Sequence, residues 1–187
     1  MTLAMFTRMV CLSSGVFGRP AWDDARCAEQ ASYMTEAAER HGIDPVLMLS
    51  LNVVECDMHT RDNPIYQEVK GRKKLVGFDA CPMGVRIIGV EKLERYDDRK
   101  LYELAATRLE RWKRWCAKQH RDRRGRPLHS FLKHYNEGNT LYADQVLAVA
   151  AVIRRRPTAR YQVSERIAEI VRRLSRVFVR GWWSPNS

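Results

Sequence analysis

The sequence predicts a single, mainly α-helical domain. Apolar side chains recur at helical spacing in segments 23–40, 98–120, 141–156 and 159–179. Proline or glycine lies at the ends of several of these segments, as expected at helix boundaries. Runs that alternate apolar and polar residues, which mark strands, are scarce. A chain of 187 residues is long enough for one domain with a sizeable core.

The first two helices are predicted to form a hairpin. The first covers about 23–40, with acidic residues at its N-terminal end and Gly42 just past its last turn, where glycine is favoured. The second begins with Asp44 as N-cap and Pro45 at the first helical position, followed by an apolar run. Only three residues separate the two segments, so we expect them to pack side by side.

Glu55 ends that apolar run and is the first candidate for chemistry. A buried carboxyl at a helix C-terminus has its pKa raised by desolvation and by the helix dipole. A raised pKa suits a general acid at neutral pH. An exposed or ion-paired glutamate at a frayed helix end is the structural alternative, and this segment alone favours that alternative.

The middle of the chain has few helical signals. Residues 58–78 are polar and contain two glycines and several cations, which predicts a long loop, or a loop with a short hairpin near 73–78. Loops of this length are often functional. Pro82 and Gly84 then predict a tight turn before the apolar segment 85–90.

Three regions of the chain are predicted from these patterns. Residues 1–20 form a loosely ordered leader that is weak as a secretory signal, and residues 21–158 form the domain. Residues 159–187 form a C-terminal helix and an aromatic tail packed on that domain. Within the domain, 128–135 is a short helix, and the basic residues of 107–126 lie opposite an apolar stripe.

Charge and cysteine content limit the possible partners. The formal net charge of +11 and a pI near 9.8 suit an anionic polymer, either nucleic acid or envelope material such as peptidoglycan. The five cysteines have no CxxC pair and no Cys/His spacing suited to zinc, so we expect neither a metal nor a cofactor. An odd count leaves at least one free thiol in a monomer, and the oligomeric state is open.

Three separated blocks resemble the lytic transglycosylase and goose-type lysozyme superfamily. The blocks are AAERHGIDPVLMLSLNVVEC (37–56), CPMGVRII (81–88) and HSFLKHYNEGNTLYADQVL (129–147). They resemble, in order, the helix that ends in the catalytic acid, a glycine-rich turn, and a Tyr-Asn-x-Gly block. The resemblance implies a lysozyme-like helical domain with a long loop or small β-hairpin near an active-site groove.

The same resemblance assigns roles to individual residues. It implies that Glu55 is the catalytic acid and that Gly84 lets the backbone approach the saccharide closely. Tyr135 takes the place of a tyrosine that positions the acid or the sugar, and Asn136 lies beside it. A helix C-cap at Asn136 is the structural alternative. The two interpretations are compatible, because the same turn can cap the helix and line the groove.

This chain departs from the family pattern at three positions. Cys56 stands where the family has serine, Ile87 where it has glutamine, and Arg86 where it has methionine. Arg86 offers a cation for the carboxylates of peptide stems. Because the family brings the two blocks together, the resemblance also implies a disulfide between Cys56 and Cys81.

The activity implied is cleavage of the β-1,4 bond between N-acetylmuramic acid and N-acetylglucosamine in peptidoglycan, by a lytic transglycosylase. A lytic transglycosylase needs one carboxylate, whereas a hydrolase needs a second, for which Asp57 and Asp79 are the nearest candidates. The expected location is the cell envelope, the periplasm or the exterior, or delivery by a phage.

Two further classes of function stay open at this point. One is a non-catalytic basic module for nucleic acid or an envelope surface, although no recognised nucleic-acid motif accompanies the basic face. The other is a degenerate fold that serves as a structural part of a secretion system or phage particle.

Overall fold

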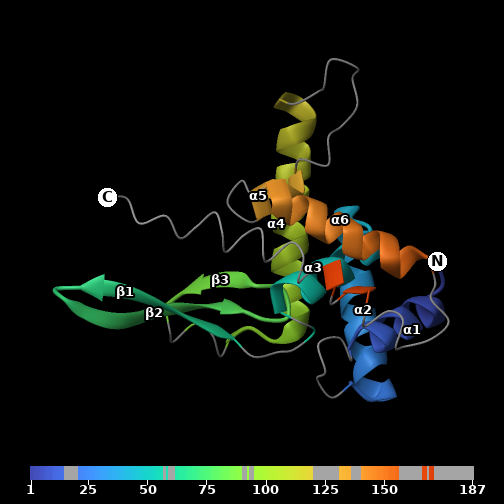
Figure 1. Ribbon diagram of the computed structural model, residues 1–187, viewed down its shortest axis with the longest axis horizontal. Helices are drawn as coiled ribbons and strands as arrows, with labels where there is room; N and C mark the ends of the chain where they lie inside the picture. The colour runs from blue at the N-terminus through green and yellow to red at the C-terminus, as the bar shows by residue number, and fades with distance from the viewer. Residues whose placement is uncertain are drawn as a thin grey trace.

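The computed structural model describes residues 1–14, 21–56, 58, 62–89, 92, 95–119, 131–135, 140–155, 166–167 and 169–170. These residues form a mainly helical protein with one small antiparallel sheet (Figure 1). The elements are, in order, α1 (Leu3–Ser14), α2 (Asp24–His41), α3 (Pro45–Cys56), β1 (Asn63–Val69), β2 (Arg72–Ala80), β3 (Val85–Ile88), α4 (Asp98–Gln119), α5 (Phe131–Tyr135) and α6 (Thr140–Arg154).

Helix α3 lies at the centre of the core and contacts α2 and α6. Nearly all of its side chains are buried, as its apolar composition requires. The Asp44 side chain accepts a hydrogen bond of 2.8 Å from the amide of Val46, so the predicted start of this helix is confirmed. Glu55 in the last turn of α3 is half-buried.

Helix α2 has the ends predicted for it. Asp23 is the N-cap and accepts from the Arg26 amide at 2.7 Å, and Gly42 closes the helix at a φ of +60°. Helix α2 packs against α1 and α4. The predicted helical hairpin of α2 and α3 is therefore present, with α4 and α6 completing the core around α3.

The sheet replaces most of the predicted loop at 58–78. Strands β1 and β2 pair from Asn63 opposite Asp79 to Val69 opposite Arg72, with a register shift between Ile65 and Tyr66, and β3 pairs with β2. Lys70 and Gly71 form the turn with φ values of +52° and +72°, as in a type I′ hairpin. Pro64 is tolerated because β1 is an edge strand.

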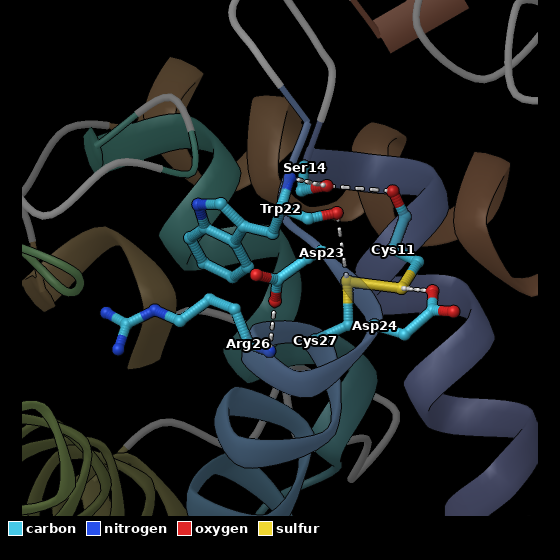
Figure 2. Close-up of a disulfide and its surroundings, with 7 residues drawn as sticks. All are labelled: Cys11, Ser14, Trp22, Asp23, Asp24, Arg26 and Cys27. Atoms are coloured by element: carbon cyan, nitrogen blue, oxygen red, sulfur yellow. Dashed lines mark hydrogen bonds between the residues drawn. A yellow bond between two sulfur atoms is a disulfide. The ribbon is translucent and has the colours of Figure 1, made fainter.

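The prediction of a loosely ordered leader is wrong for residues 3–14. They form α1, with Phe6, Met9 and Val10 buried in the core. A disulfide between Cys11 and Cys27 joins α1 to α2 (Figure 2). Beside it, the Ser14 hydroxyl donates to the Cys11 carbonyl at 2.9 Å and accepts from the Trp22 amide at 3.1 Å.

In the described part of the second half of the chain, helices α4, α5 and α6 contribute to the core. Helix α4 has the length predicted, and α6 follows the segment predicted at 141–156 closely. Of the predicted helix at 159–179, the structure describes four residues in helical conformation, including the buried Ile167. The aromatic tail lies outside the described residues. Among the helices described, none is long and apolar enough to cross a membrane.

Candidate functional site

The end of α3 meets the turn between β2 and β3, and this contact brings Glu55 to Gly84. Gly84 has a φ of +59°, and a Cβ placed on it would lie 2.7 Å from Oε2 of Glu55 and 3.1 Å from its Cβ. The backbone of the turn therefore forms one wall beside the carboxylate. Any side chain at position 84 would displace Glu55.

A disulfide joins the same two segments. Cys56, which follows Glu55, is bonded to Cys81 at the start of the turn, with their Cα atoms 5.7 Å apart. The structure thus contains the bond that the family resemblance implies. Of the cysteines, Cys116 is free and buried in the core.

Tyr135 on α5 supports the glycine turn through a hydrogen bond to its backbone. Its hydroxyl is buried and donates a hydrogen bond of 2.8 Å to the Met83 carbonyl. Burial raises the pKa of Tyr135 well above its ordinary value, the negative charge of Glu55 raises it further, and Arg108 opposes both effects. Tyr135 therefore stays protonated and holds the turn through its hydrogen bond. It lies close enough to Glu55 for the negative charge of that carboxylate to raise its pKa.

Tyr142 on α6 is a second phenol at the site. Its ring lies parallel to that of Tyr135, with centroids 6.5 Å apart. Burial raises the pKa of Tyr142 most, followed by the charge of Glu55. The hydroxyl of Tyr142 therefore stays protonated and lies close to the Glu55 carboxylate.

Arg108 on α4 completes the polar surroundings of the tyrosine pair. Its guanidinium lies 5.1 Å from the ring centroid of Tyr135, in a cation–π arrangement. From the sequence alone, Arg108 is one of several cations on the basic face of α4. Tyr142 is one residue of the block 129–147, and the resemblance gives it no role. No local pattern pairs Tyr142 with Tyr135, because the two residues lie on different helices, α6 and α5.

A buried polar chain lies one helical turn before Glu55. The Asn52 amide donates to the Tyr102 hydroxyl at 2.8 Å, which donates to Gln30 at 2.7 Å, and Gln30 donates to Asp98 at 2.7 Å. This chain joins α3, α4 and α2 across the core. It fixes the helix that carries Glu55 by directional bonds as well as by apolar packing.

The remaining predicted site residues either pair with each other on the sheet or lie outside the residues that the structure describes. Arg86 and Asp79 face each other across β3 and β2 and form an ion pair at 3.1 Å, with Arg86 half exposed. The pair gives Asp79 a structural partner. Asp57 and Asn136 lie outside the described residues. Within the described part of the chain, no group of His, Cys, Asp or Glu side chains is arranged to hold a metal ion.

The described site is thus one half-buried carboxylate enclosed by a glycine turn, two buried phenols and an arginine. Comparison of the chain with protein-family models, with curated proteins and with solved structures finds no match.

Proposed function

We propose that the protein is a lytic transglycosylase with a lysozyme-like fold, which cleaves the N-acetylmuramic acid–N-acetylglucosamine bond of peptidoglycan. The observation that carries the proposal is the juxtaposition of Glu55, Gly84 and Tyr135, which come from three separate segments. These are the segments in which the sequence resembles that superfamily. A chance resemblance in sequence would give no reason for the three segments to meet.

The proposed reaction uses Glu55 first as an acid and then as a base. Protonated Glu55 donates its proton to the glycosidic oxygen while the bond from that oxygen to the anomeric carbon breaks. The oxocarbenium-like muramyl centre is then attacked by its own C6 hydroxyl, and ionised Glu55 accepts the hydroxyl proton. The products are a 1,6-anhydromuramyl end and a free N-acetylglucosamine hydroxyl, with no water consumed.

The surrounding residues have distinct parts in this proposal. The buried, protonated Tyr142 lies close to the carboxylate, and the bare backbone at Gly84 leaves the space that Glu55 occupies beside the turn. The Asp79–Arg86 ion pair favours the transglycosylase over a hydrolase, because it engages one of the two candidate second carboxylates. Two disulfides agree with an oxidising compartment, such as the cell envelope or the exterior, where peptidoglycan lies.

The test is digestion of purified peptidoglycan by the wild type and by Glu55→Gln, followed by mass spectrometry of the products. We expect anhydromuropeptides from the wild type and a loss of at least about 100-fold in rate for the variant, since general acid catalysis contributes this much. Glu39→Gln, an exposed change on α2, is the control and should keep full activity. Reducing ends in place of anhydro ends would point to a hydrolase, and full lysis by Glu55→Gln would refute the proposal.

A further inference from the structure

The tip of the β1–β2 hairpin carries a cluster of cations, which we call the hairpin tip: Lys70, Arg72, Lys73 and Lys74. All four residues and the intervening Gly71 are exposed. Glu68 is the acidic residue nearest in the sequence, so the segment 68–74 has four positive charges and one negative charge. Figure 1 shows this hairpin projecting from one side of the helices, away from the core.

The hairpin tip differs from the cationic residues on the helices. Many of the latter are paired with carboxylates, as in Arg26–Asp98, Arg99–Glu36 and Arg154–Asp44. None of the four tip side chains forms an ion pair with any residue the structure describes. Unpaired cations that share one projecting turn give a concentrated positive potential, which attracts an anionic polymer.

The same hairpin leads from this tip to the proposed catalytic site. Strand β2 starts at the tip with Arg72 and ends at Ala80, next to the turn that holds Gly84 against Glu55. Nine residues of strand span roughly 27 Å, so tip and site are separated by about that distance along β2. One long polymer lying along the hairpin can contact both ends, whereas a short fragment bound at Glu55 cannot.

We propose that the hairpin tip is a second binding surface, which holds the carboxylate-bearing peptide stems of a peptidoglycan strand whose glycan is cleaved at Glu55. The inference rests on the proposed function for the identity of the polymer. Carboxylates are the anions that this polymer offers, and lysine and arginine at an exposed turn bind them through screened charge attraction. The tip therefore increases affinity for intact cell wall and contributes nothing to the chemical step.

The experiment measures sedimentation of the protein with purified sacculi, in the Glu55→Gln background so that no cleavage occurs. The tip variant combines Arg72→Gln, Lys73→Gln and Lys74→Gln, which preserves the Lys70-Gly71 turn. The matched control removes three exposed charges elsewhere on the molecule, by substituting glutamine at Arg8, Lys118 and Arg155. Circular dichroism checks that each variant is folded.

We expect the tip variant to bind sacculi at least about tenfold more weakly, because each lost cation lowers affinity for an anionic surface by a factor of a few. Its binding should also change less than that of the parent between about 50 and 300 mM salt, and the control should stay within about twofold. Amidation of the sacculus carboxylates should reduce binding of the parent to the level of the tip variant.

Three results would overturn the inference: unchanged binding by the tip variant, equal losses in the tip and control variants, or tip-dependent binding of duplex DNA in preference to sacculi. Failure of the proposed function has a different signature, because Glu55→Gln with intact tip would then still lyse walls or the wild type would release no anhydro products. With Glu55 restored, the tip variant should cleave short soluble glycan fragments at the wild-type rate.

Discussion

The Glu55 carboxylate lies directly against the α-carbon of Gly84, so that a methyl group added there would approach Oε2 to 2.7 Å. This contact ties the position of the carboxylate to the path of the β2–β3 turn. The β2–β3 turn itself is held by the hydrogen bond from Tyr135 to the Met83 carbonyl and by the Cys56–Cys81 disulfide.

Gly84→Ala is expected to abolish wall lysis. The added methyl group displaces Glu55, and the positive φ adds about 1 kcal/mol of strain. Gly42→Ala is the matched control, because Gly42 has a φ of +60° with no atom within 4 Å of the added group. Both variants should lose stability in thermal melts through the positive φ, Gly84→Ala more because of its contact with Glu55, and only Gly84→Ala should lose activity. Equal activity in the two would contradict the placement of Glu55.

The two tyrosines are expected to separate stability from activity. Tyr135→Phe removes the donor to the buried Met83 carbonyl and should lower the free energy of unfolding by about 1–3 kcal/mol. Tyr142→Phe keeps the buried ring but removes the hydroxyl close to Glu55, so turnover should fall more than stability does. Urea unfolding and the rate of muropeptide release measure the two effects. A fully active Tyr142→Phe would show that the hydroxyl does not act on Glu55.

The helices could be predicted from sequence because their signals are local. Asp23, Gly42, Asp44 and Pro45 mark helix ends within a few residues of the segments they bound. Most of the sheet could not be predicted because strand pairing is non-local. In addition, Pro64 indicates the end of a strand unless that strand is known to be an edge strand, as β1 is. The register shift at Ile65/Tyr66 also interrupts the alternation that marks a strand.

Some residues of the candidate site could be predicted from the sequence, and others could not. Glu55 is a candidate from its place at the end of an apolar helix, whereas Gly84 and Tyr135 are candidates only through the family resemblance, since nothing in the local patterns places the three together. Arg108 could not be distinguished from the other cations of α4, because only packing against Tyr135 sets it apart. Helix α1 was missed because it depends on burial against α2 and on the Cys11–Cys27 bond.

The two disulfides are expected to differ in their effect on activity. Replacing either pair by serines should cost about 3 kcal/mol of stability by the loop-entropy model, since the closed loops are of similar length. Loss of Cys56–Cys81 also frees the turn beside Glu55 and should lower the rate of wall lysis well below that of the Cys11–Cys27 double variant. Equal rates at a temperature where both variants are folded would contradict this.

His41 is expected to make stability fall as the pH rises above neutrality. Hydrogen bonds to Glu110 and Glu103 raise its pKa above the ordinary value of about 6.5, although burial opposes them. The stabilisation of the fold by protonated His41 is therefore fully present below the unfolded-state pKa of His41. It is lost as the pH rises through the higher folded-state pKa. Melting temperatures measured from pH 5.5 to about 9 should decline for the wild type.

The control for this pH dependence is His41→Gln, which cannot take up the proton. Its melting temperature should be lower than that of the wild type at pH 5.5, and the gap should narrow toward the alkaline end of the range. A gap that is constant over the whole range would mean that His41 contributes through packing alone.

The bond between Cys11 and Cys27 has a consequence for processing of the chain. Any peptide bond cut between these two residues would leave a molecule of two chains linked covalently, with α1 still seated on α2. Such a cut would be invisible by gel filtration and on a non-reducing gel. The short fragment would separate only after reduction, so nicked and intact material are distinguished by mass spectrometry with and without reductant.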